Sequence, residues 1–278
     1  MIVTDGHGLF KPAQPIFAPG IPPGQVQDLL KENFLPADSV DVSFNVLVLR
    51  KDNEVIVIDT GCGANFGPQA GKLPENLRAA GIDPAAVTAI VLTHAHPDHV
   101  GGLIQGKDKK VFPNALIYIS APEYHFWASE NPDFSKSKFP DNAQIASWVA
   151  LAKANLAAHK DRIKLFDDGE NLFGCIRTRI VAGHTPGHTL LHIHAGNEEI
   201  IHMADILHDH TLLPAHPEWG VGFDTDFDLA ATARKAALTE FAELRKNIFS
   251  YHLPWPGLGH IRRKGEGFEW IPQAVATP

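Results

Sequence analysis

One short stretch of the chain holds an unusual density of groups that bind metal ions. It follows the apolar, β-like run 89–92 and reads Thr93-His94-Ala95-His96-Pro97-Asp98-His99. Residues of an extended chain alternate sides, so His94 and His96 project the same way, and Pro97 suits the first turn of a helix. Three imidazoles and a carboxylate in six residues are a ligand set suited to zinc and its neighbours. A polar strand end rich in histidine is the competing interpretation, and the convergence of four ligands at one strand end opposes it.

The composition limits the class of protein. The 278 residues are 44% hydrophobic and 20% charged, which is ordinary for a globular protein, and no shift in composition marks a domain boundary. The net charge of -8 argues against a nucleic-acid partner. No apolar run is long enough to span a bilayer and no signal peptide is visible, so we expect a cytoplasmic chain with no membrane partner. Cys62 and Cys175 are too few for a disulfide framework.

The predicted elements follow the same order in both halves of the chain, strands first and helices afterwards. Residues 1–40 are rich in proline and glycine, so we expect irregular chain there with a short helix at 25–34. Strands are predicted at 42–49, 55–58, 89–92, 116–120, 162–166, 176–181, 190–194, 199–203, 249–251 and 268–271, and further helices at 73–81, 123–129, 143–159 and 228–246. Two sheets packed face to face, with helices outside, would bury these strands.

Further motifs accompany the histidine cluster. They are Ile58-Asp59-Thr60-Gly61, Gly183-His184-Thr185-Pro186-Gly187-His188-Thr189, Asp205, and the stretch from His252 through Pro256-Gly257-Leu258-Gly259-His260-Ile261. On these residues nearly the whole chain resembles the metallo-β-lactamase-fold hydrolases, and within them the methyl parathion hydrolase group. The resemblance implies an α/β (α+β) fold, the four-layer αββα sandwich, as a single domain over residues 1–278. In that family a strand precedes the segment that matches residues 3–6, which suggests a longer natural N-terminus.

The resemblance also implies a binuclear metal site. One ion takes His94, His96 and His184, the other takes Asp98, His99 and His252, and Asp205 joins them; Asp98 and Asp205 are the expected catalytic carboxylates. His188 is expected to support this shell, and Asp59 to orient a metal-bound histidine. Simpler roles stay open, namely a turn cap for Asp59, a buried acid satisfied by backbone N–H groups for Asp205, and a packed side chain for His252. Zinc is the metal we expect first, and manganese, iron or cobalt also accept such ligands.

Three residues are predicted to line a substrate pocket. Phe66 and Trp127 match aromatic pocket positions of the methyl parathion hydrolase group, and core packing is the alternative for both. His208 follows Asp205 closely and is expected at the mouth of the site. The polar loop 131–142 has the length of a flap, although an idle surface loop is the alternative. Asp224, Asp226 and Arg234 are expected to form a structural cap and ion pair at the helix 228–246.

These features predict a hydrolase that uses a metal-bridging hydroxide on a small neutral ester, lactone or phosphotriester. No cationic clamp for a charged phosphate lies beside the ligand motifs, so we expect lactones or aryl esters to be preferred, with weaker phosphotriester cleavage. The alternative is an iron-dependent oxidoreductase of the same fold, such as a persulfide dioxygenase, which would not need Asp98, His99 and His252. A small-molecule substrate is the expected partner, and a homodimer is left open.

Overall fold

The computed structural model describes residues 1–106 and 109–274, and most of its strands belong to two sheets. The first sheet has the order β1-β2-β3-β4-β7-β8, with β1 (Ile2–Phe10), β2 (Val40–Lys51), β3 (Glu54–Ile58), β4 (Ala89–Val91), β7 (Leu116–Ser120) and β8 (Ile163–Phe166). The second has the order β15-β14-β13-β12-β11-β10-β9, with β15 (Gly267–Pro272), β14 (Leu258–Lys264), β13 (Asn247–Phe249), β12 (Glu198–His202), β11 (Thr189–Ala195), β10 (Ile176–Ile180) and β9 (Asn171–Leu172). Strands β5 (Ile104–Gln105) and β6 (Lys109–Lys110) form a separate hairpin.

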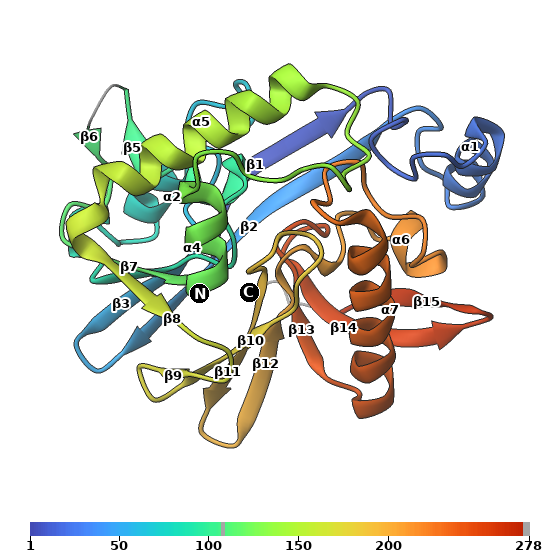
Figure 1. Cartoon of the computed structure of the whole chain (residues 1–278). Helices are drawn as coiled ribbons and strands as arrows, with labels where there is room; N and C mark the ends of the chain where they lie inside the picture. The colour runs from blue at the N-terminus through green and yellow to red at the C-terminus, as the bar shows by residue number, and fades with distance from the viewer. Residues whose placement is uncertain (107–108, 275–278) are drawn as a thin grey trace.

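Helices lie on the outer faces of the two sheets. Helices α2 (Leu73–Ala79), α4 (Ala121–Ala128) and α5 (Asn142–Ala158) lie beside the first sheet, and α7 (Phe227–Leu244) packs on β14 of the second (Figure 1). The short helices are α1 (Pro23–Glu32), α3 (Pro97–Val100) and α6 (Leu212–Ala215). This arrangement confirms the predicted αββα sandwich. No helix in residues 1–106 and 109–274 is both long and apolar enough to cross a membrane.

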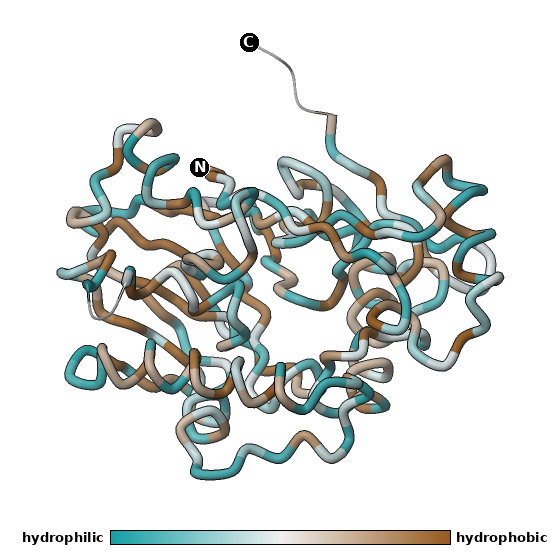
Figure 2. The backbone as a smooth tube through the Cα atoms, turned by 90° about the horizontal axis from the view of Figure 1, so that it is seen from above, coloured by the Kyte–Doolittle hydropathy of each residue, from teal (hydrophilic) through white to brown (hydrophobic). Residues whose placement is uncertain are grey.

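The alternation of side chains along the strands produces two layers of core. Between the sheets, Ile56 and Val91 of the first sheet meet Ile176 and Leu191 of the second. Their strand neighbours, such as Ile90, face the helices instead and join the larger cluster. Figure 2 shows hydrophobic residues along the strands and hydrophilic residues in the outer loops.

The N-terminal segment departs from the sequence prediction. Residues 2–10 form β1, a full edge strand paired antiparallel with β2, where irregular chain was expected. Its glycines and polar residues hide the pattern, and a register shift lies between Thr4 and Gly6. At Gly6 a Cβ would lie 1.9 Å from the carbonyl oxygen of Gln69, at a φ of +121°, so only glycine fits. The predicted helix at 25–34 ends early, at Glu32, and Phe34 is 98% exposed instead of packed.

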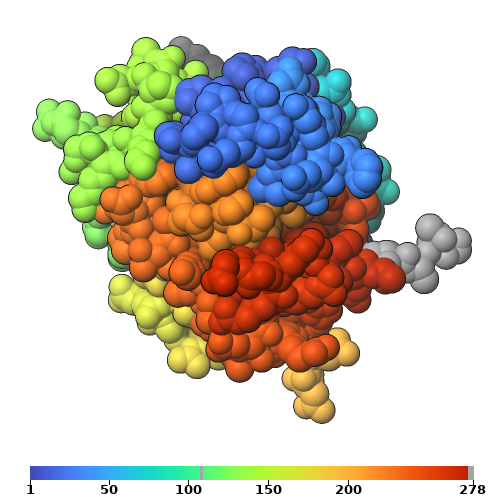
Figure 3. Space-filling model, turned by 90° about the vertical axis from the view of Figure 1, so that its right-hand side faces the viewer, coloured from blue at the N-terminus to red at the C-terminus, as the bar shows by residue number. Residues whose placement is uncertain are grey.

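Parallel strands bring the candidate ligands to one edge of the sandwich. Strands β3, β4 and β7 run parallel, so the residues that follow them leave the sheet at the same edge. Asp59 follows β3, and Thr93 and His94 come shortly after β4. Strands β12 and β13 are parallel in the other sheet and lead to Asp205 and His252. The N-terminal segment, blue in Figure 3, lies against orange C-terminal chain, with a β-bridge between Phe17 and Val221.

Candidate metal centre

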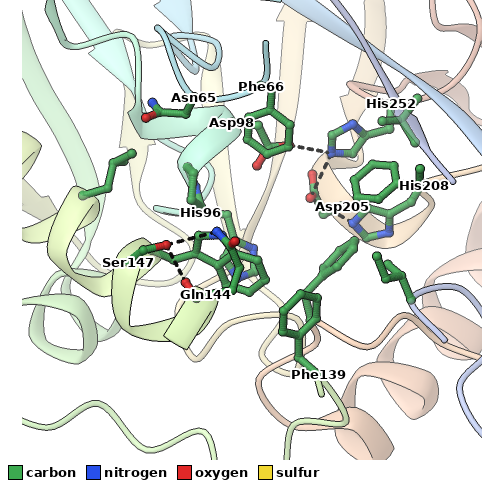
Figure 4. Close-up of a pocket in the computed structure, with 17 residues that line it drawn as sticks. Asn65, Phe66, His96, Asp98, Phe139, Gln144, Ser147, Asp205, His208 and His252 are labelled. Atoms are coloured by element: carbon green, nitrogen blue, oxygen red, sulfur yellow. Dashed lines mark hydrogen bonds and ion pairs between the residues drawn. The ribbon is translucent and has the colours of Figure 1, made fainter. Parts of the chain in front are cut away.

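The structure brings all seven predicted metal ligands together at this edge. The donor atoms of His94, His96, His184 and Asp205 lie within 4.8 Å of one another, and so do those of Asp98, His99 and His252. Asp205 reaches both sets. Its Oδ2 is 3.2 Å from His184 Nε2 and 3.1 Å from His252 Nε2, and its Oδ1 is 3.2 Å from His99 Nε2. Figure 4 shows Asp205 beside His252 and His208.

Carboxylates behind two of the histidines fix the direction of their ring protons. His184 Nδ1 lies 2.8 Å from Asp224 Oδ1, and His99 Nδ1 lies 2.9 Å from Asp59 Oδ2. An ionised carboxylate only accepts hydrogen bonds, so each Nδ1 carries the proton and donates it. In the neutral form of both rings the Nε2 atom therefore presents its lone pair to the cluster, which is the orientation a metal ligand requires.

The same reasoning applies to His252 and His94. His252 Nδ1 lies 3.1 Å from the carbonyl oxygen of Ser43, which is also an acceptor only. The Thr93 hydroxyl donates to Asp59 Oδ2 at 2.8 Å, so it accepts from His94 Nδ1 at 3.1 Å. Four ring nitrogens thus converge on one another and on Asp205, and this donor set fits divalent cations between them.

The electrostatics of the cluster also favour added positive charge. Burial, with neighbouring histidines, lowers the pKa of His94 and His96 well below the usual value, so both rings are in the neutral form that binds metals. Burial alone would lower the pKa of His99, but Asp205 and Asp98 raise it well above its usual range. The carboxylates therefore attract a cation to the centre, either a proton or a metal ion.

His188 lies behind the centre, and the structure separates its role from that of His184. His188 Nε2 accepts a hydrogen bond from the Asp205 backbone N–H at 3.0 Å, and its Nδ1 faces the Val181 carbonyl at 3.1 Å. Both ring nitrogens are used, so His188 holds the backbone of Asp205 in place. His260, on β14, directs Nδ1 at the carbonyl of Lys246.

Three supporting groups were absent from the sequence prediction or had a different role in it. Asp224, expected only in a helix-end ion pair, bonds both His184 and the fully buried Arg234, whose NH2 lies 3.0 Å from Asp224 Oδ2. Tyr251 is buried and donates to the Asp98 carbonyl at 2.7 Å. Glu123 is buried and accepts from the Ala95 N–H at 2.9 Å. The S-x-x-E spacing of Ser120 and Glu123 signals a helix start and is a local pattern, so it gives no hint of the distant partners.

A cavity of about 480 Å³ opens beside the centre (Figure 4). Its metal-ligand side is formed by His96, Asp98, Asp205 and His252, and its remaining lining residues include Phe10, Ile16, Asn65, Phe66, Phe139, Gln144, Ser147, Trp148, Leu151, His208 and Phe223. His208 lies at the wall next to the ligands, with its Nε2 3.1 Å from Asp205 Oδ2, and burial lowers its pKa to about 4. Phe66 and His208 thus lie where a substrate pocket was predicted.

Trp127 does not line this cavity. The ring is completely buried, its Nε1 donates to Glu123 Oε1 at 2.6 Å, and its edge packs against His96 with 5.5 Å between ring centroids. The prediction of a pocket role is therefore corrected, because α4 turns Trp127 under a ligand instead of into the opening. Trp148 of α5 supplies an aromatic wall that the sequence did not indicate.

Comparison with known proteins agrees with this geometry. A family model described as the metallo-beta-lactamase superfamily matches residues 41–252. AidC, described as a dizinc quorum-quenching lactonase in complex with the product N-hexanoyl-L-homoserine, is 35% identical, with a TM-score of 0.95 over 99% of this chain and 94% of that chain. The hydrolase AbOPH is 32% identical, with a TM-score of 0.88 over 99% of this chain and 94% of that chain.

A shorter match links the chain to a mammalian protein. Metallo-beta-lactamase domain-containing protein 1 of Mus musculus is 41% identical over 66 residues, which are 23% of this chain and only 21% of the mouse protein. The family model, by contrast, covers most of the chain, and it includes every residue of the two ligand sets. The chain therefore belongs to the metallo-beta-lactamase superfamily and is a metal-dependent hydrolase.

Proposed function

We propose that the protein is a binuclear metallohydrolase whose substrates are small and neutral. It hydrolyses lactones, and it also cleaves aryl esters. The observation that carries this proposal is Asp205, whose carboxylate lies within 3.2 Å of buried histidines of both ligand sets at the side of an apolar cavity. The second set, Asp98, His99 and His252, has no purpose in an oxidoreductase with a single iron, so its presence counts against that alternative.

The residues of the chain arrange this chemistry. Divalent ions held by the two ligand sets, zinc by preference, would lower the pKa of a bound water and would polarise the carbonyl group of the substrate. Asp205 and Asp98 would supply the negative charge that holds these ions, and the outer partners Asp59 and Asp224 hold His99 and His184 in the required orientation. His208 is within reach of a substrate in the cavity and of Asp205.

The cavity favours a neutral, largely apolar substrate. Phe10, Phe66, Phe139, Trp148 and Phe223 are among its lining residues, which include no lysine or arginine from the described chain. Apart from the proposed metal ions, an anionic phosphate would therefore find no cationic side chain to pair with, whereas an acyl chain would be buried against the aromatic rings. The likeness to AidC supports an N-acyl homoserine lactone as the lactone class. We also propose that the chain belongs to the methyl parathion hydrolase group. Phosphotriester cleavage is then a weaker accompanying activity.

The test compares three substrates on one metal-loaded preparation. We expect kcat/KM to be highest for an acyl lactone, lower for an aryl ester and lowest for a neutral aryl phosphotriester. An Asp205→Ala variant serves as the control for contaminating hydrolases. A phosphotriester preference of several decades would reverse the proposed order, and failure to hydrolyse any of the three would refute the hydrolytic function.

A further inference from the structure

We propose that Glu123 is the positioning residue for the ion held by His94, His96 and His184, and that it controls this site without affecting the other. The inference rests on the binuclear centre proposed above. Glu123 lies in α4, one strand away from the ligand loop after β4, and its side chain is completely buried.

Glu123 accepts four hydrogen bonds, and three of them tie two ligand loops together. Its Oε1 accepts from the Ala95 N–H at 2.9 Å, and its Oε2 accepts from Thr185 Oγ1 at 2.7 Å and from the Gly187 N–H at 2.9 Å. Ala95 lies between His94 and His96, and Thr185 follows His184 directly. A single carboxylate therefore sets the separation of the two segments that carry all three histidines of one set.

The fourth hydrogen bond explains how His96 is held. The rings of His94, His99, His184 and His252 each have an outer partner, whereas His96 Nε2 is buried and has no hydrogen-bond partner among the described residues. The edge of Trp127 packs on the His96 ring at an interplanar angle of 78°, and Trp127 Nε1 is anchored on Glu123. Glu123 thus orients His96 through Trp127 and through Ala95, in place of a direct bond to the ring.

The loop that carries Gly187 packs closely against α4 around Glu123. A Cβ on Gly187 would lie 2.3 Å from the Glu123 backbone nitrogen and 2.3 Å from Ser120 Oγ, so the glycine is needed for the loop to approach α4. The second set of ligands has a different buried carboxylate, because Asp59 bonds His99 directly. Asp59 also reaches His94 through the Thr93 hydroxyl, whereas none of the four hydrogen bonds of Glu123 goes to the second set. A site-selective effect of Glu123 is therefore testable.

The test is the isosteric variant Glu123→Gln. The amide NH2 cannot accept two of the four donors, so the loops must shift apart while the volume is kept. We expect the affinity for the ion held by His94, His96 and His184 to fall about 10- to 100-fold, which is the usual effect of changing an outer partner of a metal ligand. The affinity for the other ion should not change. Chelator competition with zinc measures both affinities, and cadmium NMR assigns the weakened site. Asp59→Asn alters the partner of His99 and, through Thr93, that of His94, so it should weaken both sites.

Matched variants separate positioning from general destabilisation. Asp5→Asn alters another buried carboxylate, which accepts from the backbone N–H groups of Cys62, Gly71 and Leu73, and it should lower Tm without weakening the Glu123-linked site selectively. Thr185→Val and Trp127→Phe each remove one of the four hydrogen bonds, keep Glu123 and should weaken the same site by less. If Glu123→Gln does not fold, these two variants test whether Glu123 positions the ion of His94, His96 and His184.

The outcomes distinguish this inference from the proposed function. Wild-type protein that binds fewer than two ions refutes the binuclear centre itself. The other outcome is that wild-type protein binds two ions, but the variants of Glu123, Thr185 and Trp127 weaken both sites equally or neither. Glu123 is then only a structural tie, and its selective role is overturned.

Discussion

The orientation of each imidazole in the centre is decided by the group behind it. Asp224, Asp59, the Ser43 carbonyl and the Thr93 hydroxyl all accept from an outer Nδ1, so the inner Nε2 is the nitrogen that each neutral ring offers to a metal ion. The protein therefore holds these four ligands ready for metal, which lowers the ordering cost of binding.

Asp205 is the residue on which both ions should depend. Asp205→Ala removes the carboxylate that touches both sets and would leave two cations to repel each other. We expect loss of at least one ion and a fall in kcat/KM of more than about 100-fold, which exceeds the usual effect of an outer partner. Metal analysis and circular dichroism of the purified variant check this result. A variant that keeps wild-type turnover would refute the bridging role.

The two tryptophans near the site should respond differently to truncation. Trp127 is fully buried, so Trp127→Ala should cost about 3–5 kcal/mol of stability, as large core truncations do. Trp148 lines the cavity, so Trp148→Ala should raise KM for acyl or aryl substrates with a smaller change in Tm. Thermal unfolding and steady-state kinetics of the pair provide the comparison. A higher KM for Trp127→Ala at unchanged stability would restore its predicted pocket role.

At the level of elements, the start of α7 connects the edge of the sandwich that carries the candidate metal ligands to a surface loop. Asp226 caps the helix by accepting from the Leu229 N–H, and its carboxylate pairs with Lys136 of the loop between α4 and α5 at 2.7 Å. Its backbone N–H donates to the Gly183 carbonyl, next to His184. The cap therefore anchors the loop that carries a metal ligand as well as the helix.

Removal of this cap should lower stability in a pH-dependent way. Asp226→Ala should cost about 1 kcal/mol at neutral pH, the typical loss of an N-cap. The Lys136 hydrogen bond lowers the pKa of Asp226 below 3.8, so the charged form contributes stability above that pH and loses it as pH falls through the folded-state pKa. Urea unfolding of both proteins from pH 7 to pH 3 should show the difference shrinking only at the acid end. A constant difference would mean that the charge is irrelevant.

At the scale of the whole molecule, each sheet supplies part of the centre. The first sheet leads to Asp59, His94, His96, Asp98 and His99, and the second to His184, Asp205 and His252. Metal bound between them would cross-link the two halves, and binding would then be coupled to folding.

This coupling predicts a stability that depends on metal. Seven ligands in two sets should take up about two equivalents of divalent metal per chain, as binuclear hydrolase sites do. Chelation should lower Tm, and re-addition of metal should restore it in proportion to occupancy. Elemental analysis alongside a thermal melt at each loading measures both. Saturation at one equivalent would contradict the binuclear centre.

The sequence alone predicted much of this protein because its strongest signals are local. The alternation of apolar residues located most strands, and H-x-H-x-D-H places two ligands on one side of a strand end whatever surrounds it. The αββα fold and the grouping of the seven ligands were expected from these motifs and from the resemblance they carry. Strand β1 was missed because glycine and polar residues interrupt its alternation, and its place is decided by pairing with β2.

Other features depend on residues far apart in the chain, and only the tertiary structure decides them. His184 and His188 are alike in sequence, yet packing turns one into the cluster and the other onto the Asp205 backbone. Glu123 has the spacing of an ordinary helix cap, and its four partners come from three separate segments. Trp127 does not take its predicted place in the pocket, and Trp148 lines the cavity, because the orientation of each helix on the sheet selects which ring faces the cavity.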